Sequence, residues 1–383
     1  MTQQLAPAAV AESPSLVIPR VQGELGWKYL AGPGRDLRFD FVRGLCVLGM
    51  ICNHVAGSSW ARLFSLSNGI LITPAEGFVF ISGFVLGMVY RPRVDRGGVG
   101  AAIEKSLGRT WTLYRLTLVL TLVFGLSLMG IGQPQLVGLG SNPVTFVLDV
   151  VAMHRTIYLV DVIMMYTFLT AAGSAALWFL ARDKTAWLLS LSFALWLAYQ
   201  LDPQWASGIP WTIAGNDLFH IAAWQMPFVI ALTLGYHQTA FMRWFSSARV
   251  SRAMFAIAST VFAVLVYLVV VPTPLRPWVE ALSQKEAEGP VRLLACLFVF
   301  QFVRLLVTYG WRPLHAGLGW LLVPLGQNSL YAYVVHLGLI AAMWLPIQSV
   351  VNSETWSTAI QLGTVLVVWY LIKNRVLFRI IPR

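Results

Sequence analysis

The chain has 383 residues, of which 57% are hydrophobic and only 11% are charged, and its mean hydropathy is +0.70. This composition excludes an ordinary soluble enzyme and predicts an all-α, polytopic integral membrane protein. The net charge of +11 does not indicate a nucleic-acid partner, because the lysines and arginines are spread over short loops between apolar runs.

The chain divides into a polar tail and a single membrane domain. Residues 1–39 predict a disordered, basic cytoplasmic tail, and residues 40–380 predict one transmembrane domain. About ten helices are expected in that domain, some of them short enough to be tilted or broken, over residues 41–59, 70–90, 110–133, 157–181, 185–201, 217–236, 251–271, 291–310, 328–346 and 356–378. Residues 314–327 are expected to form a broken or re-entrant segment before the ninth span.

The distribution of basic residues predicts the orientation in the membrane. Most of the 27 lysines and arginines fall in the two terminal segments and in every second loop, above all in the loop over residues 91–109. The positive-inside rule therefore places both termini in the cytoplasm of a cell with a cytoplasmic (inner) membrane. The connections over residues 60–69, 134–156, 202–216, 272–290 and 347–355 then face outward.

The first expected span contains an arginine and a histidine on one helix face. Arg43 and His54 are eleven positions apart, which is close to three full turns. The rise of 1.5 Å per residue separates them by about 16 Å along the axis. Ionisable side chains inside a membrane are costly and mark functional sites, although an anchoring arginine and a core histidine are the simpler alternative.

The second expected span, in the sequence AEGFVFISGFVLGMVY, contains one carboxylate. Packing through small residues explains its glycines, but it does not explain Glu76, which needs a partner or a proton inside a membrane. Glu76 and His54 are both expected in the outer half of the membrane. We therefore predict that the carboxylate orients the imidazole, so that His54 and Glu76 are the candidate catalytic pair.

Three later motifs supply candidate binding residues. Arginines in RTWTLYRL are either interfacial anchors or phosphate ligands. The Trp-Gln pair of the sixth span either binds a sugar or only packs, and the i, i+4, i+7 residues of NSLYAYVVHL share one helix face. The residues concerned are Arg109, Arg115, Trp224, Gln225, Ser329, Tyr333 and His336. No Cys/His spacing typical of a metal site is present, and no metal is expected.

The combination of these motifs resembles the OpgC family, within or bordering the acyltransferase-3 superfamily of membrane proteins. The segment RDLRFDFVRG with its later histidine, the SGF segment after an acidic residue, the LYR segment and the Trp-Gln pair carry the resemblance. It covers most of residues 35–346, densely at first and loosely in the middle.

The resemblance implies an O-acyltransferase that moves an acyl group, succinyl or acetyl, from cytoplasmic acyl-CoA to a hydroxyl of an extracytoplasmic or lipid-linked glycan. His54 would be the general base. Arg43, Arg109 and Arg115 would hold the CoA phosphates, and the Trp-Gln pair and the NSLYAYVVHL residues would contact substrate. The alternative is a glycan or lipid transporter of the cell envelope, in which the same buried charges line a passage; such proteins often show inverted repeats, and none is evident by eye.

Overall fold

The structure is a computed structural model that describes residues 35–55, 59–61, 71–130, 142–244, 247–347 and 353–383. Within these ranges the chain is helical, and β pairing is limited to an isolated bridge between Arg155 and Ala214. The predicted all-α class is confirmed for the described residues. Residues 1–34 of the predicted tail lie outside them, whereas the last residues of that tail belong to the first helix.

The helices follow one another with short connections. They are α1 (Leu37–His54), α2 (Pro74–Gly130), α3 (Pro143–Val151), α4 (Asp161–Leu180), α5 (Thr185–Leu201), α6 (Pro203–Ala206), α7 (Ile221–Tyr236), α8 (Gln238–Trp244), α9 (Ala248–Val270), α10 (Arg276–Ala281), α11 (Pro290–Tyr309), α12 (Trp311–Gln327), α13 (Ser329–Ile347) and α14 (Glu354–Lys373).

Five helices of the described part are long and apolar enough to cross a membrane. They lie within α2, α4, α9, α11 and α14, and shorter apolar helices are present in α5, α7 and α13. The chain is therefore a membrane protein, in agreement with its composition. The number of ten spans and the cytoplasmic position of both termini stay predictions.

Two expectations about local structure are wrong. The predicted loop over residues 91–109 is helical, and α2 continues through it with one break at Gly98, whose φ of 77° is left-handed and suits glycine. Residues 311–327 form the helix α12 instead of a broken segment. Pro324 lies inside this helix, and Gly326 serves a close helix contact, so neither residue interrupts the helix.

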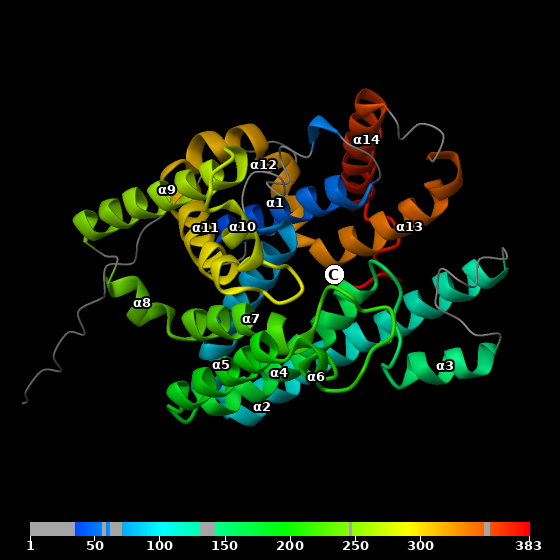
Figure 1. Ribbon diagram of the computed structural model, residues 1–383, viewed down its shortest axis with the longest axis horizontal. Coiled ribbons are helices and arrows are strands. Elements are labelled where there is room, and N and C mark those ends of the chain that lie inside the picture. The colour runs from blue at the N-terminus through cyan, green and yellow to red at the C-terminus, as the bar shows by residue number, and fades with distance from the viewer. Residues whose placement is uncertain (1–34, 56–58, 62–70, 131–141, 245–246, 348–352) are drawn as a thin grey trace, which may run out of the picture.

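Helix α1 runs through the middle of the molecule, beside α12 and α14 and against α2 (Figure 1). Its start is fixed by Asp36, which accepts a hydrogen bond from the backbone N–H of Arg38 at 3.0 Å. Two glycines bring α1 and α12 together: a Cβ on Gly44 would lie 1.9 Å from the carbonyl oxygen of Leu322, and one on Gly326 would lie 1.8 Å from that of Asp40. Small residues allow this backbone approach, as in many membrane helix pairs.

The first half of α2 packs on α7 in the same manner. A Cβ on Gly87 would lie 2.1 Å from the carbonyl oxygen of Leu232, and one on Gly235 would lie 1.9 Å from that of Phe84. The glycines of the AEGFVFISGFVLGMVY segment therefore serve helix packing, which is the structural explanation considered for that segment. The tight contacts of α1 and α2 with their neighbours fix the helix faces that surround the site.

Candidate functional site

A large cavity of about 850 Å³ opens between α1, both halves of α2, α4 and α13. Residues before and after the break at Gly98 line it, so the two halves of α2 face each other across this space. Its lining includes four of the predicted site residues, Arg43, Arg109, Ser329 and Tyr333, together with the basic residues Arg93, Lys105 and Arg383 and the carboxylate Glu104. The cavity is therefore rich in positive charge.

The basic residues of the large cavity differ in exposure. Arg93, Lys105 and Arg109 are exposed, whereas Arg43 is partly buried. The Nε of Arg43 is shielded from solvent and has no hydrogen-bond partner among the described residues. A shielded guanidinium with an unused donor is suited to an anionic ligand, because guanidinium binds phosphate and carboxylate with paired hydrogen bonds.

A small cavity of about 190 Å³ lies next to the large one and shares Met50 and Val162 with it. Its polar lining comes from the end of α1, the start of α4 and the connection before α11, and consists of Asn53, His54, Thr73, Tyr158, Asp161 and Lys285. The two cavities are thus adjacent on opposite sides of the α1–α4 contact. Because Arg43 lines one and His54 the other, the two residues that the sequence aligned on one helix face belong to neighbouring spaces.

His54 pairs with a second histidine. The Nδ1 of His54 lies 3.0 Å from the Nε2 of His336, and their rings are stacked with centroids 5.3 Å apart. The Nδ1 of His336 lies 3.3 Å from the carbonyl oxygen of Ala332, one turn earlier in α13. His336 is fully buried, and it contacts the ring of Tyr333 at 4.8 Å.

This geometry fixes the tautomers. A carbonyl oxygen can only accept, so the Nδ1 of His336 donates to Ala332. In a neutral imidazole the other nitrogen then accepts, and the Nε2 of His336 receives the Nδ1–H of His54. The Nε2 of His54 consequently has a free lone pair, while the ring borders the small cavity. This arrangement is that of a general base held in one orientation.

Tyr333 lies between the two cavities. It lines the large cavity, its ring lies 6.0 Å from that of His54, and its hydroxyl donates to the carbonyl oxygen of Leu159 at 2.7 Å. Leu159 in turn lines the small cavity. The predicted shared face of Ser329, Tyr333 and His336 is therefore present, with the first two on the large cavity and the third behind His54.

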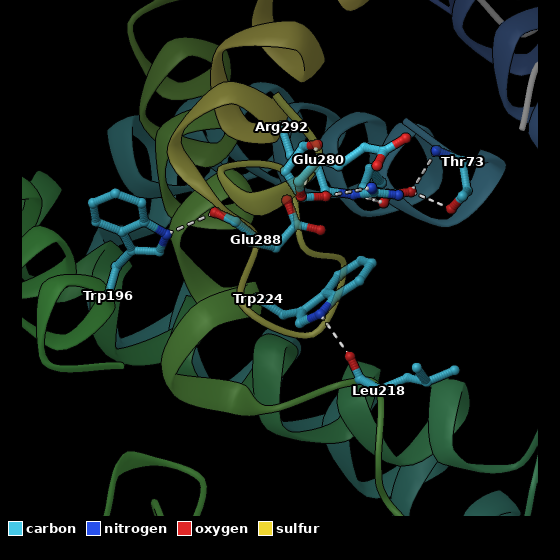
Figure 2. A network of polar contacts seen from close by, with 9 residues as sticks. Thr73, Trp196, Leu218, Trp224, Glu280, Glu288 and Arg292 are labelled. Carbon is cyan, nitrogen blue, oxygen red and sulfur yellow. Dashed lines mark hydrogen bonds and ion pairs between the residues drawn. The ribbon is translucent and has the colours of Figure 1, made fainter. Parts of the chain in front are cut away.

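The predicted contact between His54 and Glu76 is wrong. The fully buried Glu76 accepts from the Nε of Arg292 at 2.6 Å and from the backbone N–H and the hydroxyl of Thr73 (Figure 2). Depth along the helix placed His54 and Glu76 at similar levels, but it could not show that Arg292 of α11 would approach Glu76 from the other side. Glu76 is bonded within the fold and leaves His54 to His336.

Two other predicted substrate contacts are also internal. Trp224 is fully buried and donates through its indole N–H to the carbonyl oxygen of Leu218 at 3.0 Å (Figure 2). Gln225 is buried and bonds to both the hydroxyl and the carbonyl oxygen of Ser192. Neither residue is in the lining of the two cavities, so the packing alternative is the correct one for this pair.

Arg115 does not reach the large cavity. Its side chain is exposed and its guanidinium lies 6.0 Å from the ring centroid of Trp111. Two residues of the small cavity, Tyr158 and Lys285, were not predicted as site residues, because each is a single polar residue in an expected connection or span end. Their only sequence signal is a position next to an apolar span on the same side as His54.

The chain belongs to the OpgC family: the family model described as OpgC protein matches residues 35–376. Searches of curated proteins and of solved structures gave no match. The predicted family is confirmed, whereas its link to the acyltransferase-3 superfamily stays a prediction. Membership of this family favours a membrane acyltransferase that modifies glucans.

Proposed function

We propose that the protein is an O-acyltransferase of the cytoplasmic membrane, which moves an acyl group such as succinyl or acetyl from cytoplasmic acyl-CoA to a hydroxyl of an extracytoplasmic or lipid-linked glycan. The observation that carries this proposal is the pair of adjacent cavities with His54 beside their shared wall. One cavity is large and cationic, as a polyanionic donor requires. The other is small and contains the free nitrogen of an oriented imidazole.

The large cavity suits the donor in size and charge. Its volume of about 850 Å³ lies at the upper end of the range of about 300–1,000 Å³ for small-molecule sites. The exposed Arg93, Lys105 and Arg109 would meet the CoA phosphates at the mouth, and Arg43 would meet an anionic group deeper inside. The predicted role of Arg115 in CoA binding is not retained, since its side chain lies elsewhere.

The chemistry follows from the tautomer of His54. The acceptor oxygen bonds to the thioester carbonyl carbon while the Nε2 of His54 takes its proton, which gives a tetrahedral adduct and an imidazolium. The adduct re-forms its carbonyl as the carbon–sulfur bond breaks, and the imidazolium returns the proton to the leaving thiolate. An acyl-histidine intermediate on the same nitrogen is an alternative route with the same products.

His336 has the positioning role that was first expected of Glu76. By accepting the Nδ1–H of His54 it holds the ring with Nε2 on the opposite side, and its own bond to Ala332 prevents the reverse tautomer. A neutral partner supports this orientation without placing a second negative charge in the membrane. Glu76 has a different role, because its ion pair with Arg292 connects α2 to α11.

A release assay tests the proposal against the transporter alternative. The purified protein in lipid nanodiscs, given acetyl-CoA or succinyl-CoA with a glucose oligomer, should release free CoA and form an ester detectable by mass spectrometry. His54→Ala should do neither. His237→Ala is a matched control, because that histidine bonds to Thr185 away from both cavities. Transport of the oligomer in proteoliposomes with no loss of thioester would overturn the proposal and favour a transporter.

A further inference from the structure

Lys285 brings a positive charge to the small cavity. It lies in the connection between α10 and α11, and among the described residues that line this cavity it is the one lysine or arginine. Its charge acts on His54 and on Asp161, both of which share the cavity. It forms no ion pair with a described carboxylate, and its ammonium lies 5.3 Å from the ring centroid of Phe219.

The connection that carries Lys285 is held at three backbone carbonyls. Arg292 donates to the carbonyl oxygen of Ser283 at 3.1 Å, Gln200 to that of Ala287 at 2.6 Å, and Trp196 to that of Glu288 at 2.9 Å. Figure 2 shows the two ends of this arrangement, Trp196 on Glu288 and Arg292 toward Thr73.

Arg292 is itself fixed by its ion pair with Glu76 at 2.6 Å. The buried network around Glu76 therefore positions the segment on which Lys285 lies. A cation on a segment held in this way is preorganised, and preorganised charge is the main source of electrostatic catalysis.

Base catalysis at His54 creates a charge that the site must stabilise. When the hydroxyl adds to the thioester, the carbonyl oxygen becomes an oxyanion within a few ångströms of the imidazole. Arg43 is about 16 Å away along α1, too far to reach that oxygen. Asp161 accepts from the backbone N–H of Val162 at 2.8 Å and is itself an acid, so it cannot supply positive charge.

We propose that Lys285 is a catalytic residue that stabilises the oxyanion of the tetrahedral adduct in the small cavity. This inference rests on the proposed acyl transfer and assigns its electrophilic partner. The ammonium donates to the oxyanion as the acceptor oxygen bonds to carbon, and it releases the oxygen when the carbonyl re-forms with loss of thiolate. Lys285 keeps its proton throughout, so the proton from the acceptor still moves through His54.

The test compares Lys285→Met and Lys285→Arg with Lys184→Met in the CoA-release assay. Lys184 is a matched control because its ammonium also lies near an aromatic ring, 5.5 Å from that of Trp178, and outside both cavities. We expect Lys285→Met to lower kcat about 10²–10³-fold with either acyl-CoA, the effect of removing one oxyanion donor. Lys285→Arg should keep a larger share of kcat, and Lys184→Met should resemble the parent.

A binding measurement excludes a structural effect. CoA should raise the thermal unfolding temperature of Lys285→Met as much as that of the parent, because the donor cavity is unchanged. If Lys285→Met does not fold, Lys285→Gln and Lys285→Arg make the same comparison.

Three outcomes overturn the inference in different ways. A kcat of Lys285→Met within about threefold of the parent removes Lys285 from catalysis and leaves the acyltransferase proposal intact. A loss with succinyl-CoA alone shows that Lys285 binds the acyl carboxylate instead of the oxyanion. Absence of CoA release by the parent with both donors removes the proposed function, and this inference with it.

Discussion

Two buried polar clusters border the small cavity, and they differ in whether any bonding capacity is left unused. Around Glu76, both carboxylate oxygens are engaged by Arg292 and Thr73. In the pair of His54 and His336, every ring nitrogen is bonded except the Nε2 of His54. An ionisable side chain inside a membrane is thus not sufficient evidence of catalysis, since a complete ion pair stabilises and an unused lone pair beside a cavity can react.

The largest expected effect comes from removing that unused lone pair. His54→Ala should lower kcat for CoA release by about 10²–10⁴-fold, the usual contribution of a general base, with a nearly unchanged thermal unfolding temperature. The KM for acyl-CoA should change little, because the donor cavity does not depend on this side chain. A variant that keeps more than a tenth of the parental kcat would contradict the role of base.

The Glu76 cluster should respond in the opposite manner. Glu76→Ala leaves the buried Arg292 unpaired, which typically destabilises a protein by about 3–5 kcal/mol. Thermal unfolding in detergent measures the loss. The double variant Glu76→Leu, Arg292→Met should recover part of the stability because it removes both charges, although the bond to the carbonyl oxygen of Ser283 is lost.

If Glu76→Ala were as stable as the parent and instead lost only kcat, the comparison would fail. Glu76 would then act in the reaction, as the sequence first indicated. A modest fall in kcat together with the lower stability is expected, because the segment that bears Lys285 depends on Arg292.

His336 lies between these extremes, since it touches the base and not the substrate. His336→Ala should lower kcat about 10–100-fold, the usual effect of losing a group that orients a functional histidine. His336→Gln offers an amide oxygen to the Nδ1–H of His54 and should recover part of the rate. Equal kcat values for the two variants would show that His336 serves packing and not orientation.

The helices were predicted better than the contacts between them. Apolar runs predict elements whose length the membrane sets, and the expected span over residues 185–201 agrees with α5 (Thr185–Leu201). Turn and breaker signals were less informative. Pro324 and Gly326 indicated a broken segment, yet a glycine in a membrane helix also permits close packing, and α12 uses it against α1.

The candidate site was predicted only as far as one helix can determine it. The spacing of Arg43 and His54 gave their common face, and the spacing in α13 gave that of Ser329 and Tyr333, with no information on other helices. The partner of His54 depends on how α2 and α13 are rotated about their axes. Glu76 was the attractive candidate by charge, but the rotation of α2 directs it to Arg292.

The smallest expected effects separate two arginines of the donor side that the sequence treated alike. Arg43 lines the large cavity with a shielded Nε that lacks a described partner, whereas Arg115 lies exposed near Trp111. Arg43→Ala should weaken CoA binding about tenfold, the effect of losing a charged hydrogen bond of about 1.5 kcal/mol. Arg43→Lys should recover binding poorly if the guanidinium makes paired bonds. Arg115→Ala should leave the affinity within about twofold, since an exposed stacked arginine holds no donor group. Isothermal titration of CoA into each variant measures the difference, and a larger loss for Arg115 than for Arg43 would move the donor site out of the large cavity.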